Sequence, residues 1–143
     1  MTIGTLIEGR ASAQIVSCTA ERPMRDVVAL LAEQRIGALP VMEQGRVVGI
    51  FSERDVLYCL AKEGAAALDR PVREAMTAPA ITIDRATGVD EALALMTRRR
   101  IRHLPVLDGE SLCGFISIGD LVKSKIDEVE REAAQMRHYI QTA

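Results

Sequence analysis

The feature that most constrains the fold of this chain is an internal repeat. Residues 101–120 read IRHLPVLDGESLCGFISIGD, and a segment about 65 residues earlier, residues 36–55, reads IGALPVMEQGRVVGIFSERD. The two segments align without a gap. The shared residues are Ile36, Leu39, Pro40, Val41, Gly49, Ser52 and Asp55, which recur as Ile101, Leu104, Pro105, Val106, Gly114, Ser117 and Asp120. The chain is therefore predicted to contain two copies of one motif, and its function is expected where the copies meet.

Each copy is predicted to fold as strand, helix, strand, strand and helix. The expected elements are residues 15–18, 23–34, 39–42, 46–52 and 53–62 in the first copy, and 81–83, 88–99, 104–107, 112–116 and a helix beginning near 118 in the second. Asp108-Gly109 is typical of a hairpin turn. Gly37 is expected to end a helix in the left-handed conformation, and Thr87 to cap one. The fold class is therefore α/β (α+β).

Both ends of the chain are predicted to be helical. Ile3, Leu6 and Ile7 have helical spacing and favour a short N-terminal helix that packs on the main body. At the other end, apolar residues alternate spacings of four and three, as in a heptad pattern: Val122, Ile126, Val129, Ala133, Met136 and Ile140. This long C-terminal helix could pack on the second copy or meet another subunit, and the second reading is preferred for its distal half.

Composition limits the function classes. The 143 residues include 48% hydrophobic residues but only 3% aromatics and no Trp, so the core must be aliphatic. A net charge of −2 and few aromatics make nucleic-acid binding a minor alternative. The three cysteines are scattered and apolar in context, which fits core packing in a reducing cytoplasm. Neither a signal peptide nor a membrane span is predicted.

Both copies contain the pattern Gly-h-x-Ser-x-x-Asp, in which h is apolar, at a strand-to-helix junction. The glycine is expected to let a ligand approach the strand end. Ser52 and Asp55, like Ser117 and Asp120, would lie on one side of the first helical turn. A carboxylate there can accept hydrogen bonds from a ribose diol, and free backbone N–H groups favour an anion nearby. One such pair is more often an ordinary helix cap, but its repetition favours a ligand site.

Basic residues distinguish the two copies. Arg102 and His103 precede the second Leu-Pro-Val segment, where they could bind phosphate near Asp120. Gly37 and Ala38 occupy the equivalent positions of the first copy, with only Arg54 as a partial replacement. The second copy is therefore predicted to be the better phosphate binder, because it combines the basic pair with its own Ser and Asp.

With these motifs in view, the chain resembles the CBS-domain family, named after cystathionine β-synthase. The resemblance rests on the tandem β-α-β-β-α copies, the I-x-x-L-P-V segments and the repeated G-h-x-S-x-x-D. It divides the chain into a first CBS motif at 10–68, a second at 72–127 and a C-terminal helical extension at 128–143. It is closest to the small stand-alone bacterial CBS-pair proteins.

The resemblance implies one pseudo-twofold module, often paired into a disc-like dimer, with clefts that bind adenosine-containing ligands. AMP or ATP is the first candidate, followed by ADP, NAD and S-adenosylmethionine. The implied ligand-binding residues are Ser117, Asp120, Arg102, His103, Ile83, Ser52, Asp55, Arg54 and Val16, with adenine near Val16 and Cys18 or near Ile81 and Ile83.

The expected function is therefore a cytoplasmic, homodimeric regulatory module, such as an energy sensor, that acts on an unknown partner protein. No nucleophile–base set or metal cluster is visible in the sequence, so neither an enzyme nor a catalytic cofactor is expected. The alternative is a structural or dimerisation protein whose ligand sites have degenerated.

Overall fold

In a computed structural model that describes residues 1–10 and 14–142, the two copies form two similar three-stranded sheets. The first copy consists of β1 (Cys18–Thr19), α2 (Met24–Gln34), β2 (Ala38–Glu43), β3 (Arg46–Ser52) and α3 (Glu53–Glu63). Two 3-10 turns, η2 (Gly64–Asp69) and η3 (Val72–Glu74), lead out of it. The second copy consists of β4 (Ile83–Asp84), α4 (Val89–Arg99), β5 (His103–Asp108), β6 (Ser111–Ser117) and α5 (Ile118–Thr142), and α1 (Ile3–Ile7) precedes both.

The strand register confirms that the copies are repeats. In each sheet, the short first strand runs parallel to the second, and the second is antiparallel to the third. Ala38 pairs with Ser52 as His103 pairs with Ser117, and the register shifts at the corresponding point in both hairpins. This mixed α/β architecture is the predicted fold class.

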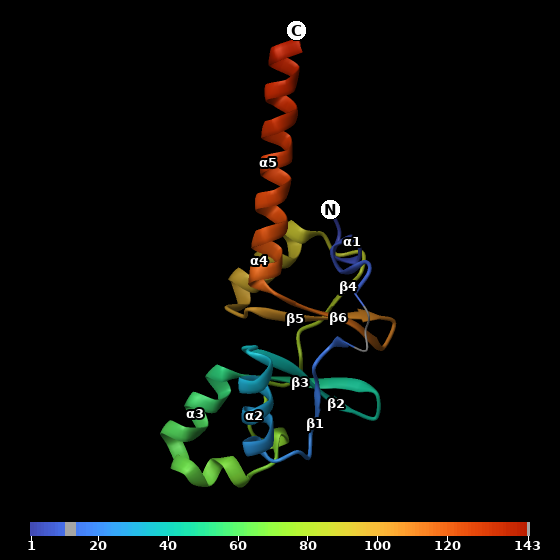
Figure 1. Ribbon diagram of the computed structural model, residues 1–143. Helices are drawn as coiled ribbons and strands as arrows, with labels where there is room; N and C mark the ends of the chain where they lie inside the picture. The colour runs from blue at the N-terminus through green and yellow to red at the C-terminus, as the bar shows by residue number, and fades with distance from the viewer. Residues whose placement is uncertain (11–13, 143) are drawn as a thin grey trace.

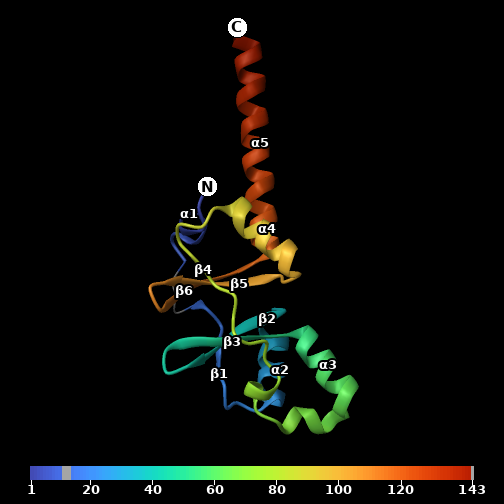
Figure 2. The ribbon, with the colours of Figure 1, turned by 180° about the vertical axis from the view of Figure 1, so that it is seen from behind.

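The two sheets face each other in the middle of the molecule, and the helices lie on the outer sides (Figures 1 and 2). Strands β3 and β6 touch across this interface. Each copy nevertheless has its own apolar core, one around Phe51 and Leu39 and the other around Ile116 and Leu104, all completely buried. The space between the sheets is thus bounded by both copies.

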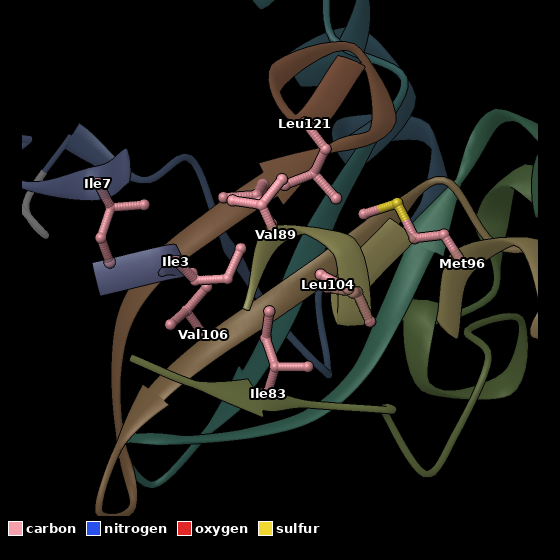
Figure 3. Close-up of a cluster of buried hydrophobic side chains, with 10 residues drawn as sticks. Ile3, Ile7, Ile83, Val89, Met96, Leu104, Val106 and Leu121 are labelled. Atoms are coloured by element: carbon pink, nitrogen blue, oxygen red, sulfur yellow. The ribbon is translucent and has the colours of Figure 1, made fainter. Parts of the chain in front are cut away.

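The segment that precedes each copy packs against the other copy. The N-terminal helix α1 packs on the second copy, where Ile3 and Ile7 join the core beside Val106 (Figure 3). Its backbone is held there, because Ile3 N donates to the Thr87 carbonyl oxygen at 2.8 Å. Conversely, the linker between the copies packs on the first copy through buried Val72. The predicted short N-terminal helix on the main body is confirmed.

Several predicted boundaries are wrong in detail. The strands expected at 15–18 and 81–83 are only the two-residue strands β1 and β4, since their remaining residues form no ladder. Gly37 does not end α2: Arg35 adopts the left-handed conformation there, and Arg100 does so after α4. Thr87 does not cap α4, because its hydroxyl bonds Asp84 and Gly88 is the N-cap.

The predicted C-terminal helix is present and longer than any other element. Its first turns pack on the second copy through buried Leu121, and Lys125 bonds Asp90 of α4 at 3.1 Å. Beyond residue 128, the helix projects away from the body (Figures 1 and 2), and residues 129–142 are all exposed.

Candidate functional site

The Ser and Asp of each repeated pattern form a reciprocal capping box. At the start of α3, the Ser52 backbone N donates to Asp55 Oδ2 at 2.9 Å, and the Asp55 backbone N donates to Ser52 Oγ at 3.4 Å. Ser117 and Asp120 make the same two bonds, at 2.9 and 3.2 Å. Each pair therefore has a structural role, which satisfies helix N–H groups that would otherwise be unpaired.

The second oxygen of each carboxylate lies outside this box and is contacted by the segment that precedes a repeat. The Thr77 hydroxyl donates to Asp55 Oδ1 at 3.1 Å, and Arg10 Nη2 lies 3.6 Å from Asp120 Oδ1. A carboxylate oxygen has more than one lone pair. The Oδ1 atoms of Asp55 and Asp120 can therefore each accept a further hydrogen bond from a ligand.

The glycine of the pattern has a different role from the expected one. A Cβ on Gly49 would lie 2.7 Å from Met76 Sδ and 2.8 Å from the Thr77 carbonyl oxygen, so the glycine admits the linker rather than a ligand. The linker is paired there, with Ile50 N donating to Thr77 O at 3.0 Å and Thr77 N donating to Ile50 O at 2.8 Å. Gly114 likewise makes room for Ile7. The prediction that these glycines provide ligand access is wrong.

A cleft of about 440 Å³ lies between the two copies and will be called the inter-repeat cleft. Its volume is within the range of small-molecule sites. Residues from the first copy, the linker and the second copy line it: Gly37, Ala38, Ile50, Ser52, Glu53, Arg54, Asp55, Leu57, Tyr58, Thr77, Pro79, Ala80, Ile81, Arg100, Ile101, Arg102 and His103. Apolar walls with a few polar groups suit a ligand with a flat ring and a charged end.

The cleft joins Ser52 and Asp55 of the first copy with Arg102 and His103 of the second. From the sequence, the basic pair was expected to accompany Asp120 in its own copy. The sheets face each other, however, so the start of β5 lies beside the start of β2. An added Cβ on Gly37 would be 3.8 Å from His103 Cε1. The sequence-based grouping differs because one copy alone does not define the space between two.

Arginines add positive charge at the same cleft. Arg54 also lines it, and its Nη1 donates to the Arg100 carbonyl oxygen at 3.4 Å, which links α3 to the end of α4. Arg102 is exposed, so its guanidinium can turn toward an anion. These cations offer planar sets of donors for phosphate oxygens.

The pKa of His103 depends on burial and on charged groups from both copies. Its ring stacks on Phe115, with centroids 5.4 Å apart. Burial lowers the pKa of His103 below 6.5, and Arg102 adds to the lowering, whereas Asp120 and Glu53 oppose it. Asp120 belongs to the second copy and Glu53 to the first, so this imidazole lies within electrostatic reach of a carboxylate from each copy.

The remaining predicted residues lie elsewhere. Val16 is half-buried and packs against the first core, at the position equivalent to Ile81. Ile83 is buried in the second core (Figure 3). It also borders a broader, more polar depression of about 710 Å³ outside α4, which contains none of the Ser–Asp or Arg–His groups. Neither Val16 nor Ile83 lines the inter-repeat cleft.

Sequence reasoning missed the contribution of the linker. Thr77 bonds Asp55, and Pro79 and Ala80 form a wall of the cleft. Arg100 also lines the cleft and was not among the predicted site residues. The signal that could have found the linker is Pro79 itself, because a proline in a short linker restricts its path.

Two further properties follow from the coordinates. Within residues 1–10 and 14–142, no cluster of three or more His, Cys, Asp or Glu side chains could hold a metal ion. None of the helices in that part of the chain is both long enough and apolar enough to cross a membrane.

The repeated motif, the facing sheets and the cleft between them define a tandem-repeat α/β module. The sequence profile of the CBS domain matches residues 9–62 and again residues 72–127. The chain therefore belongs to the CBS-domain family and consists of a pair of such domains with few additional residues.

Relatives support this assignment. The chain is 35% identical over 129 residues to the mitochondrial CBS domain-containing protein CBSX3 of Arabidopsis thaliana, covering 87% of this chain and 63% of that protein. It thus spans less than two thirds of that relative. A structure of a protein with CBS domains from Burkholderia ambifaria has a TM-score of 0.81 and 38% identity, and the match covers 89% of this chain and 95% of that one. CBSX2 in complex with AMP has a TM-score of 0.76 at 24% identity over 88% and 96% of the chains, which shows the shared fold.

Proposed function

We propose that this protein is a regulatory module that binds an adenine nucleotide, AMP or ATP, in the inter-repeat cleft. The observation that carries the proposal is the meeting of Ser52 and Asp55 with Arg102 and His103 around one cavity. The first pair suits a ribose and the second a phosphate, and a nucleotide presents both groups. The AMP complex of CBSX2, which has the same fold, supports this choice of ligand.

Each side chain has a distinct role in the proposed complex. Asp55 accepts hydrogen bonds from the ribose hydroxyls, and the Ser52 hydroxyl holds the carboxylate in place from 3.1 Å. Arg102 and His103 bind phosphate, with Arg54 as a further donor. Adenine packs against apolar residues of the cleft, among them Ile81. A bidentate Arg–phosphate contact and a buried imidazole favour a charged ligand over a neutral nucleoside.

Ser117 and Asp120 form a second, weaker candidate site. Ser117 and Asp120 do not line the inter-repeat cleft, whereas Arg54, Arg102 and His103 do. Arg10 beside Asp120 is the nearby positive charge. We therefore assign the higher affinity to the inter-repeat cleft with Ser52 and Asp55, and Val16 is the proposed apolar contact of the second site.

Binding is proposed to regulate rather than to catalyse. A ligand that spans both copies stabilises one arrangement of the two sheets over others, and this shift is what a partner protein would detect. Homodimerisation, a cytoplasmic location and the sensing of energy charge belong to this proposal. In the alternative, the sites are degenerate and the module serves assembly only.

Isothermal titration calorimetry with AMP, ADP, ATP, NAD and S-adenosylmethionine tests the proposal. Asp55→Asn keeps the shape but loses a charge-assisted acceptor, so binding of AMP or ATP should weaken about 10- to 100-fold. Asp120→Asn is the matched control, because it changes the equivalent capping box and should weaken the tightest event by less than about 3-fold. Nucleotide released from the purified protein on denaturation would be identified by mass spectrometry.

The outcomes separate the two hypotheses. Tight binding that Asp55→Asn weakens by the expected factor, and Asp120→Asn does not, supports a nucleotide sensor. If none of the five ligands binds and none is released on denaturation, the assembly alternative stands. If binding depends on Asp120 and not on Asp55, the assignment of the main site is wrong although the function is retained.

A further inference from the structure

Helix α5 carries an apolar stripe from Val122 to Ile140 that is largely exposed in the described part of the chain. Five of its side chains are between 43% and 67% exposed: Val122, Ile126, Val129, Met136 and Ile140. With Ala133 they occupy alternate a and d positions of a heptad repeat. From residue 129 onward the helix projects beyond the body (Figures 1 and 2), and residues 129–142 are all exposed. A helix in water needs such a stripe to be covered if it is to be stable.

The charges beside the stripe indicate what covers it. In a parallel pair of helices, a residue at position g faces position e of the next heptad on the other helix. Lys125 then faces Glu130 of a second copy, and Glu132 faces Arg137. All of these contacts, in both directions, join opposite charges. Lys125 already forms an ion pair with Asp90 of its own chain, so its attraction to Glu130 of the second copy is correspondingly weaker.

The opposite helix direction is disfavoured by the same residues. When two copies run antiparallel over the full stripe, e faces e and g faces g. Glu130 then faces Glu130, Glu132 faces Glu132, and Lys123 faces Arg137. Like charges at these positions destabilise a coiled coil, so the charge pattern selects the parallel arrangement.

We propose that the α5 helices of two copies form a parallel, in-register coiled coil over residues 122–140. The twofold axis then runs along the helix pair and brings the two second CBS domains together at its base. This arrangement is independent of whether the clefts hold a nucleotide.

Disulfide trapping of the full chain tests the helix direction. Ala133→Cys places a thiol at the a layer, where identical residues of a parallel pair face each other within disulfide distance. It should give a covalent dimer under mild oxidation. Ala134→Cys, one residue on and turned away from the stripe, is the matched control and should remain largely monomeric on a non-reducing gel. The wild-type chain gives the background from its own cysteines.

A charge exchange tests the pairing. Glu132→Arg creates like charges across the interface and should raise the dimer dissociation constant about 3- to 10-fold by sedimentation. Adding Arg137→Glu should restore it, because each helix again offers opposite charges to the other. The two residues do not face each other on one helix, so rescue reports contact between copies.

The outcomes decide the proposal. A dimer that is trapped at residue 133, not at 134, and rescued by the double exchange supports it. If the protein sediments as a monomer at about 100 µM, a concentration at which even a weak dimer would be detectable, the proposal is overturned. A dimer without trapping at 133 overturns it too, because its interface or helix direction is then different. Binding of another protein to the stripe of a monomeric chain would also overturn it.

Discussion

The substitution Gly49→Ala should be unusually costly, because Gly49 is the point at which the linker crosses the first sheet. The added methyl carbon would lie 2.7 Å from Met76 Sδ and 2.8 Å from the Thr77 carbonyl oxygen. The sulfur belongs to a flexible side chain and can move. The carbonyl cannot move alone, because Thr77 and Ile50 exchange two backbone hydrogen bonds, of 3.0 and 2.8 Å.

The magnitude follows from these contacts. Overpacking a tight site by one methyl group costs about 1–3 kcal/mol. Relief of the clash by moving the linker weakens two hydrogen bonds, each worth about 0.5–1.5 kcal/mol. The free energy of unfolding should therefore fall by about 2–4 kcal/mol, which for a chain of this size lowers Tm by roughly 5–15 °C. Displacement of Thr77 should also weaken nucleotide binding, since its hydroxyl bonds Asp55.

Two other glycines provide controls measured by the same urea and thermal unfolding. A Cβ on Gly114 would meet the tip of Ile7 at 3.0 Å, so Gly114→Ala should cost only about 1 kcal/mol. Gly119 lies in the first turn of α5 with its nearest neighbour at 3.6 Å, so Gly119→Ala should be neutral or stabilising by up to about 1 kcal/mol. The reasoning is refuted if Gly49→Ala is no more destabilising than Gly114→Ala.

Two further predictions concern titratable groups. Burial lowers the pKa of His103 from its ordinary value in the free protein, and a bound phosphate should raise it, so nucleotide affinity should increase as pH falls from the bound-state pKa toward the free-state pKa. Calorimetry in buffers of different ionisation enthalpy should detect proton uptake, and a pH-independent affinity unaltered in His103→Gln would exclude His103 as a phosphate ligand. Burial raises the pKa of the Cys18 thiol to about 11, so iodoacetamide should not modify Cys18 in the native protein at pH 8. In urea, the exposed thiol should react. Rapid labelling in the native state would contradict the packing of the first core.

The repeat made most of the fold predictable. Identities at fixed spacing fixed the number of copies, and alternation and helical spacing located every main element from α2 to α5. The errors lie at element ends. Arg35 and Arg100 adopt the left-handed conformation usually given to glycine. The predicted end of α2 at residue 34 is correct, but Gly37 was wrongly expected to adopt that conformation after it. The two-residue strands β1 and β4 carry too few residues for a pattern to define their limits.

The grouping of the site residues could not be read in the same way. The spacing of apolar residues predicts the elements of one copy at a time. The cleft, however, depends on which copy the N-terminal segment and the linker each pack against. Residues before the first copy pack on the second, and residues after the first pack back on the first, as the bonds of Ile3 and Thr77 demonstrate. Such contacts are set by tertiary packing between distant segments. The sequence therefore identified Ser52, Asp55, Arg102 and His103 singly, without showing that they line one cavity.

The division between structural and variable positions explains how two similar copies can give unequal clefts. The Ser–Asp capping box begins a helix in both copies, so folding alone is enough to retain it. The residues at the start of β2 and β5 have no such structural role. Gly37 and Ala38 precede or begin a strand in one copy, and Arg102 and His103 do so in the other. Because these starts project into the space between the sheets, a change in one copy alters the cleft between the two copies. Gly37 lines the same cleft as Ser52 and Asp55, and a Cβ there would lie 3.8 Å from His103 Cε1. Gly37→Arg should therefore change phosphate affinity in the inter-repeat cleft, which isothermal titration calorimetry would measure.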